Sequence, residues 1–278
     1  MQFNFGTRAS LTIVRKPRPL RLLTLSRQAT LTALFLCASL LSCTTLIRGR
    51  GIDRVWPATH MYLPDRAPVR VEHADLAAVE REVKAPLPTV IFLHGSTGYQ
   101  RHYFQAAYPA ALAQAGFAVF VPDSYARPGR VSAEWDVRID TVNLRRAEVD
   151  DTLDHLRNIP WVDQRNIFLA GHSEGGITTA MYGGGDFRAY FISGWTCRSE
   201  NPEFNRIHAP ADKPVLAILG AEDKYHRTKN AGHCGQVFEP LRNAKSRSIV
   251  LPGIGHEVNT HPDTIPTLIS FFKAELIN

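Results

Sequence analysis

The sequence predicts an α/β fold with a mostly parallel central sheet and helices on both of its faces. Two observations lead to this prediction. Several short runs are apolar throughout instead of alternating with polar residues, and they alternate along the chain with longer helical patterns. Strands of that kind need cover on both faces, and a helix between successive strands provides it through right-handed crossovers. We expect one such domain over residues 65–278, preceded by a leader over 1–42 and a linker over 43–64.

The predicted strands start with a weak candidate at Val69–His73 and continue as apolar runs bounded by turn residues. These runs are Thr89–Gly95, Phe117–Asp123, Asn166–Ala170, Ala189–Trp195, Pro214–Asp223 and Ser246–His256. The predicted helices lie between the strands and after the last one. They are Tyr103–Gly116, Ala133–Asn158, a helix that starts at Gly176, and Thr264–Leu276, with further helices expected between the last three strands.

The leader has the order of a secretory signal: a basic stretch, the apolar run Leu31–Leu41, and small residues. Eleven residues at about 1.5 Å each span only about half of a bilayer core. The sequence "LLSC", which ends at Cys43, resembles a bacterial lipobox, whose cysteine receives lipid. We therefore expect a lipoprotein-type signal peptide, a membrane tie through lipidated Cys43, and a location in the periplasm or at the outer membrane. Simple cleaved secretion and an uncleaved anchor are the alternatives.

The net positive charge of the chain comes from this leader. The formal net charge is +6, and residues 1–42 contain six basic residues and no acidic one. The remainder is therefore close to neutral and has no cationic stripe that could bind phosphates. This distribution argues against a nucleic-acid partner.

The cysteines fit export to an oxidising compartment. Of the four, Cys37 lies in the apolar run of the leader and Cys43 is the lipidation candidate. Cys197 and Cys234 remain, and an even pair in an exported chain suggests a disulfide. Two unpaired thiols are the alternative.

The stretch "LAGHSEGG", Leu169–Gly176, carries the strongest functional pattern. A G-x-S-x-G pattern arises by chance often enough to be weak alone, but here it follows a predicted strand and precedes a helix. That is the setting of a nucleophile elbow, a tight turn in which side chains at Gly171 and Gly175 would collide with neighbouring backbone. The pattern predicts Ser173 as a nucleophile, and the alternative is a loop serine that caps a helix.

A serine hydroxyl needs a base and a carboxylate that orients the base. In this architecture the chain order is serine, then acid, then histidine, each after a strand. Asp223 and His256 stand in these places, with Glu222 as the alternative acid. Their ordinary readings are a helix-capping aspartate and a surface histidine.

An oxyanion hole requires two backbone N–H groups aimed at the charged oxygen. One should come from Glu174, directly after the nucleophile, and the other from the loop His94–Gly98, where we select Ser96. We expect the ring of His94 to brace this loop. We expect the side chain of Glu174 to face solvent or the substrate pocket.

Together the elbow, "LHGSTG", "GAED" and "GIGHE" resemble the α/β-hydrolase superfamily, and more narrowly its dienelactone hydrolase-like branch, over about residues 65–278. The resemblance implies the α/β-hydrolase fold, with Ser173 as nucleophile, Asp223 as acid and His256 as base. Dienelactone hydrolases themselves carry cysteine at the nucleophile position, so the serine here implies an esterase or a related acyl hydrolase. Related secreted members carry a cysteine pair placed like Cys197 and Cys234.

Other residues invite chemical readings that the sequence does not favour. Four residues suggest zinc but match no ligand motif, so we expect neither metal nor cofactor: His226, His233, Cys234 and His261. The run Arg145–Asp151 is typical of a solvated helix face. Three aromatic residues near strand ends fit either the acyl pocket or ordinary packing: Tyr103, Tyr125 and Trp195.

These observations predict an exported serine hydrolase that cleaves a small-molecule ester, or another acyl compound, through an acyl-enzyme. A peptidase or amidase of the same fold is the first alternative. A non-catalytic envelope lipoprotein that uses the scaffold for binding is the second.

Overall fold

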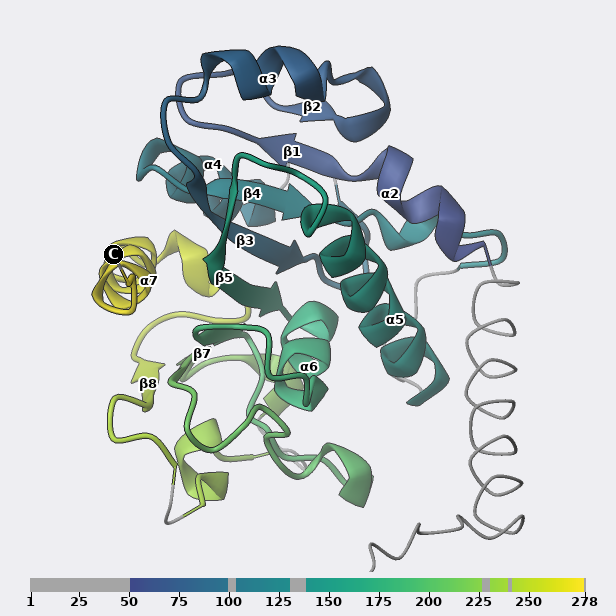
Figure 1. Ribbon diagram of the computed structural model, residues 1–278. Helices are drawn as coiled ribbons and strands as arrows, with labels where there is room; N and C mark the ends of the chain where they lie inside the picture. Colours follow the sequence, from purple (N-terminus) through teal and green to yellow (C-terminus); the bar gives the residue numbers. More distant parts are fainter. Residues whose placement is uncertain (1–50, 100–103, 131–138, 227–230, 240–241, 278) are drawn as a thin grey trace, which may run out of the picture. The chain divides into compact units, whose positions relative to one another are not determined.

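The computed structural model describes residues 51–99, 104–130, 139–226, 231–239 and 242–277 (Figure 1). The expected signal peptide, the lipidation candidate Cys43 and the aromatic residue Tyr103 lie outside these ranges. Within them, no helix combines the length and the apolar character that crossing a bilayer requires.

One eight-stranded sheet organises the described chain, in the order β2-β1-β4-β3-β5-β6-β7-β8. β1 pairs antiparallel with both β2 and β4, and all other neighbours are parallel. The strands are β1 His60–Tyr62, β2 Val69–Arg70, β3 Leu87–Leu93, β4 Ala118–Val121, β5 Val162–His172, β6 Tyr190–Ser193, β7 Val215–Gly220 and β8 Arg247–Leu251. The mostly parallel sheet matches the expectation, and it places the carboxyl ends of β3 to β8 at one edge.

The start of the domain differs from the prediction. The helix α2, Val55–Ala58, and the strand β1 both lie in the segment expected to be a linker over 43–64, so the sheet begins before residue 65. β1 has only three residues, too few for a periodic signal. The predicted strand Val69–His73 is also shorter than expected, because Val71–His73 form a 3₁₀ helix.

Helices cover both faces of the sheet, as the apolar strands require (Figure 1). One core contains residues of α3, Leu76–Glu82, of α5, Ile139–Leu156, and of α6, Glu174–Met181. The other contains residues of α4, Ala107–Gln114, and of α7, Thr264–Ala274. Successive residues of β3 belong alternately to the two cores: Ile91 and Leu93 to the first, Val90 and Phe92 to the second. All four are fully buried.

The connections after β6 and β7 lack the helices that we expected there. Their described residues contain only short 3₁₀ helices, at Pro202–Phe204, Lys224–His226 and Cys234–Val237. Prolines are frequent in the first connection and prevent a continuous helix. A disulfide between Cys197 and Cys234 joins the two connections, and both cysteines are buried. The cross-link holds the two connections together at a buried position.

Candidate active site

The turn between β5 and α6 holds Ser173 in an unusual backbone conformation. Its φ is 56° and its ψ is −120°, a region that non-glycine residues rarely occupy. The Ser173 N–H donates a hydrogen bond to the carbonyl of Ser193, at 2.8 Å. In register, Gly171 pairs with Leu93 of β3, and His172 pairs with Ser193 of β6. The turn is therefore held between two neighbouring strands, which keeps the strained conformation in place.

The two glycines of the pattern are required by close backbone contacts. A Cβ atom on Gly171 would lie 2.2 Å from the carbonyl oxygen of Gly175. A Cβ atom on Gly175 would lie 2.1 Å from the carbonyl oxygen of Leu93. Both distances are far below van der Waals contact, so the collisions expected from the sequence would occur. The first turn of α6 consequently packs directly on the end of β3.

Asp223 and His256 form a close pair at the same edge of the sheet. Asp223 follows β7 and His256 follows β8, and His256 Nδ1 lies 2.6 Å from Asp223 Oδ2. The other oxygen, Oδ1, accepts a hydrogen bond from the N–H of Tyr225. Asp223 is 1% exposed. The carboxylate places the imidazole proton on Nδ1, which leaves the Nε2 lone pair to accept a proton.

The alternative acid, Glu222, does not take this place. Its residue is exposed, and its backbone N–H donates to the carbonyl of Ile254. The hydrogen bond to His256 comes from the neighbouring Asp223. The two adjacent acids differ because the chain after β7 buries Asp223 and exposes Glu222.

His256 lies against the elbow. Its ring centroid is 4.9 Å from that of His172, the residue before Ser173. Its Cε1 atom is 3.3 Å from the place that a Cβ atom on Gly194 would occupy. Gly194 follows Ser193, whose carbonyl holds the Ser173 N–H. Ser173, His256 and Asp223 thus all lie at the carboxyl ends of parallel strands, with the ring of His256 against the residue before Ser173.

The loop His94–Gly98 after β3 closes the other side of this edge. A Cβ atom on Gly95 would lie 3.4 Å from the Ser173 Cβ, so the loop carrying Ser96 touches the elbow that carries Glu174. The side chain of Gln105 holds the loop, because its Oε1 accepts a hydrogen bond from the Gly95 N–H at 2.7 Å. Gln105 is buried and was not predicted from the sequence. Its position in a predicted helix gave no sign of this contact.

His94 braces this loop, as the sequence suggested. Its Nδ1 lies 2.7 Å from the carbonyl oxygen of Gly95, and its Nε2 accepts a hydrogen bond from the Ser124 N–H. The ring therefore carries its proton on Nδ1 and is neutral. Burial, followed by the nearby charge of Arg145, holds the pKa of His94 well below its ordinary value.

Of the other aromatic candidates, Tyr125 supports the loop from behind. Its hydroxyl donates a hydrogen bond to the Ser96 carbonyl, and the guanidinium of Arg130 lies 4.9 Å from its ring centroid. Trp195 is buried in the core. Both contribute to packing around the edge of the sheet.

Behind the elbow on the α4 side lies a hydrogen-bonded chain of three buried side chains that the sequence did not indicate. The Tyr108 hydroxyl is 2.7 Å from Ser193 Oγ, which is 3.0 Å from His172 Nδ1. Burial raises the pKa of Tyr108 well above its ordinary value, so the phenol stays protonated. This chain supports the ring of His172 beneath His256.

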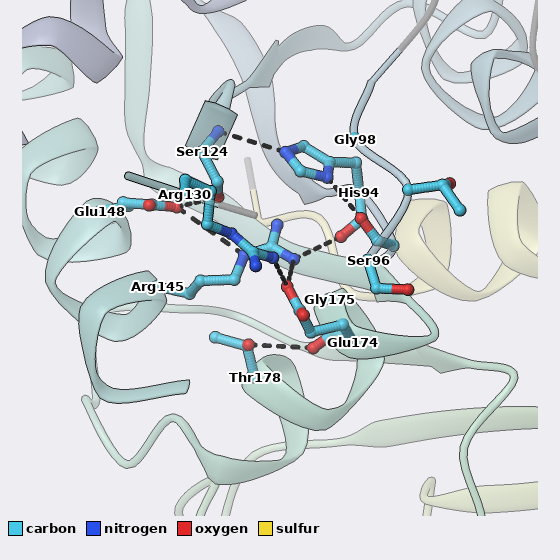
Figure 2. A network of polar contacts seen from close by, with 12 residues as sticks. His94, Ser96, Gly98, Ser124, Arg130, Arg145, Glu148, Glu174, Gly175 and Thr178 are labelled. Atoms are coloured by element: carbon cyan, nitrogen blue, oxygen red, sulfur yellow. Dashed lines mark hydrogen bonds and ion pairs between the residues drawn. The ribbon is translucent and has the colours of Figure 1, made fainter. Parts of the chain in front are cut away.

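On the α5 side lies a buried set of charged residues, which we call the elbow-support cluster (Figure 2). It consists of Arg127, Arg130, Arg145, Glu148 and Glu174, and their side chains are at most 5% exposed. Arg127 Nε lies 2.6 Å from Glu148 Oε1, and Arg145 Nη1 lies 2.9 Å from Glu174 Oε1. Each carboxylate is therefore matched by guanidinium groups within the protein.

This cluster corrects two predictions. The run Arg145–Asp151 is not a solvated helix face, because Arg145 and Glu148 are fully buried. The Glu174 side chain faces neither solvent nor a pocket, because it turns toward α5 and pairs with Arg145. A signal was available: Arg145 stands three residues after Val142 and four before Val149, both fully buried, and so lies on the apolar stripe of the helix.

Two of the residues that suggested zinc make other contacts. Cys234 is in the disulfide, and His233 Nδ1 lies 3.0 Å from Ser248 Oγ. Among the residues that the structure describes, no group of three or more potential ligands is gathered as a metal site.

Comparison with known proteins gives consistent matches. Residues 90–217 match the model of the alpha/beta hydrolase family. Esterase YjfP of Escherichia coli (strain K12) is 24% identical over 237 residues, which cover 69% of this chain and 90% of that protein. A phospholipase/carboxylesterase from Dyadobacter fermentans DSM 18053 has a TM-score of 0.51 at 16% identity, covering 69% of this chain and 92% of that one. Est1E from Butyrivibrio proteoclasticus has a TM-score of 0.50 at 16% identity, covering 78% and 93%.

Proposed function

We propose that this chain, an esterase-like hydrolase with the α/β-hydrolase fold, cleaves carboxylic esters with Ser173 as its nucleophile. The observation that carries the proposal is the pair formed by the partly exposed His256 and the buried Asp223, 2.6 Å apart, at the sheet edge where Ser173 is held in a strained turn. A buried acid that orients an imidazole beside a strained serine is the arrangement expected for an activated hydroxyl.

In this mechanism His256 Nε2 takes the proton of the Ser173 hydroxyl as the oxygen attacks the ester carbonyl. Asp223 keeps the other ring nitrogen protonated and stabilises the imidazolium that forms. The tetrahedral intermediate collapses when the C–O bond to the alcohol breaks and His256 returns the proton to that oxygen. Water then attacks the acyl-enzyme, His256 accepts its proton, and the carboxylic acid leaves with Ser173 restored.

The negative charge of each tetrahedral intermediate is held by the backbone N–H groups of Ser96 and Glu174. Support for this pair comes from the close approach of Gly95 to Ser173 and from the contact of α6 with the end of β3. Donors fixed before the reaction need no reorganisation when the charge appears, which is why such sites are effective.

We further propose that the chain is exported and carries lipid on Cys43. The support is the order of the leader, with basic residues before a short apolar run and "LLSC" at its end. Metabolic labelling with a palmitate analogue tests it: the wild type should be labelled and Cys43→Ala should not. Equal labelling of both would refute lipidation at this position.

A fluorophosphonate probe and a panel of p-nitrophenyl esters of increasing chain length test the catalytic proposal. Ser173→Ala should abolish labelling and lower turnover by about 10⁶-fold. Ser246→Ala is the matched control, because Ser246 lies at the amino end of β8, away from the carboxyl ends of the strands, where its hydroxyl accepts a hydrogen bond from the Val215 N–H. The control should keep both labelling and turnover.

Two results would redirect the proposal. Faster hydrolysis of aminoacyl nitroanilides than of any ester would indicate a peptidase or amidase that uses the same three residues. A folded wild type that neither reacts with the probe nor turns over any substrate would favour a non-catalytic binding protein.

A further inference from the structure

We infer that Glu174 and Arg145 are positioning residues, which hold together the two chain segments that supply the oxyanion donors. The inference rests on the proposed function and adds to it the side chains that set its geometry. Glu174 would then serve the reaction twice: its backbone N–H would face the substrate, and its carboxylate would fix where that N–H lies.

The carboxylate of Glu174 is turned away from solvent, toward α5 (Figure 2). Its Oε1 atom accepts hydrogen bonds from Arg145 Nη1 at 2.9 Å and from Arg130 Nη2 at 2.5 Å. Glu174 is the first residue of α6 and directly follows Ser173, so ion pairs to its side chain restrain the residue next to the nucleophile. The ion pairs therefore act on the elbow itself.

The same amino group of Arg145 reaches the second segment. Arg145 Nη1 also donates a hydrogen bond to the carbonyl of His94, at 2.5 Å (Figure 2). His94 precedes the proposed donor Ser96 by two residues. One nitrogen atom thus ties the oxyanion loop to the first residue of α6, at a place where a Cβ atom on Gly175 would lie only 2.8 Å from the His94 carbonyl oxygen.

General stabilisation does not account for this use of charge. Removing two ions from water is costly, and replacing a buried ion pair by apolar residues of similar size is often neutral or stabilising. A guanidinium offers donors in a rigid planar fork, which defines the relative position of its acceptors better than apolar contact does. Arg145 is fully buried, so its orientation is set by these acceptors and by the packing of α5.

Charge neutralisation is a second consequence of the pairing. An unpaired carboxylate on the residue after the nucleophile would oppose the negative charge that develops on the substrate. Arg145 and Arg130 both contact Glu174 and offset that repulsion. Loss of Arg145 should therefore reduce catalysis more than loss of the Glu174 charge does.

The test is the kcat per active site of Glu174→Gln and Arg145→Lys with p-nitrophenyl butyrate. Active sites are counted by fluorophosphonate labelling, so that unfolded molecules do not enter the rate. Because removal of one oxyanion donor costs about 10²- to 10³-fold, displacement of the donors should lower kcat by about 10- to 100-fold, with the larger loss in Arg145→Lys. KM should change by less than about threefold, since the donors act on the transition state.

Asp150→Asn is the matched control. Asp150 lies on the same helix, α5, and accepts a hydrogen bond from Tyr182, just after α6, at 2.7 Å. The variant makes the same acid-to-amide change as Glu174→Gln, in a hydrogen bond between α5 and the residue after α6. This hydrogen bond involves neither the oxyanion loop nor the elbow. Its kcat per site should equal that of the wild type.

A boronic acid that forms a tetrahedral adduct gives an independent readout. Its affinity should fall in parallel with kcat in the two variants, whereas a merely structural role would lower only thermal stability and the yield of labelled sites. If the single variants do not fold, Glu174→Met/Arg145→Met replaces the pair by apolar residues and should fold with a kcat at least tenfold below wild type.

An unchanged kcat per site in the folded variants would overturn the inference, as would an equal loss in Asp150→Asn. Neither result would touch the proposed function, because the wild type would still be labelled at Ser173 and would still hydrolyse esters. The proposed function is tested separately, by probe labelling and ester turnover of the wild type and of Ser173→Ala.

Discussion

Removal of the disulfide gives the prediction whose size can be worked most directly from the structure. Cys197 and Cys234 are 37 residues apart in sequence, and the loop that they close contains the whole of β7. The perturbation is the double variant Cys197→Ala/Cys234→Ala. Both cysteines are buried, at 0% and 1% exposure, so a reductant reaches the bond only when the protein opens.

The magnitude follows from the entropy that the cross-link removes from the unfolded chain. For a loop of 37 residues, the chain-entropy relation gives about 13 cal/mol/K, or about 4 kcal/mol of unfolding free energy at 25 °C. For a domain of this size, such a loss corresponds to a decrease in Tm of about 8–16 °C. Because the effect lies in the unfolded state, the denaturant m-value should rise when the unfolded chain is no longer cross-linked.

The assay is guanidinium denaturation followed by tryptophan fluorescence and circular dichroism. Wild-type protein that is unfolded, reduced and refolded under reducing conditions is the control, since it keeps both sulfur atoms and lacks only the bond. The two forms should be destabilised by similar amounts. A loss below about 1 kcal/mol in both, with the bond verified in the oxidised protein, would refute the chain-entropy reasoning.

Three further predictions concern the site. Asp223→Asn should keep the fold but lower kcat by about 10⁴-fold, because an amide no longer selects the required imidazole tautomer; a steady-state assay showing less than a tenfold loss would contradict it. Gly175→Ala should sharply lower the yield of folded protein, since its Cβ would lie 2.1 Å from the Leu93 carbonyl oxygen, whereas Gly185→Ala, which meets nothing within 4 Å, should fold normally in a thermal melt. The pKa of His94 is lowered in the folded protein, whereas in the unfolded chain it has its ordinary value of about 6.5. As the pH falls below that value, the unfolded chain therefore binds a proton at His94 that the folded protein does not. Stability should therefore fall from pH 7 to pH 5 by up to about 1.4 kcal/mol per pH unit, and denaturation of His94→Asn should lack this contribution.

The parts of the fold that the sequence predicted are those with strong local signals. β3, β6, β7 and the second half of β5, from Ile167, are largely apolar runs that are buried on both faces, as a central parallel strand requires. The elbow was predictable because its steric requirement falls on glycines at fixed spacing. The closeness of Asp223 and His256 was predictable because each stands a few residues after a strand, and parallel strands bring such positions to one edge.

The remaining features depend on contacts between distant segments. The helical spacing places Arg145 on the apolar stripe of α5, but its acceptors on Glu174 and His94 are distant in sequence, so these contacts could not be predicted. β1 is too short to have a period of its own and exists because β4 offers it a pairing edge. The helix expected after β6 is absent from the described residues, because the prolines and the disulfide of that connection favour irregular backbone.

At residue 173 the backbone conformation sets thermal stability against the proposed catalytic activity. Glycine occupies the conformation with φ of 56° and ψ of −120° at little cost, whereas a residue with a side chain gives up about 1–3 kcal/mol to be there. A screen that rewards only heat resistance would therefore enrich glycine at the position where the proposed hydroxyl chemistry begins. Any directed-evolution library built on this scaffold should keep the codon for Ser173 fixed, because the most thermostable variants would otherwise be those that lack its hydroxyl.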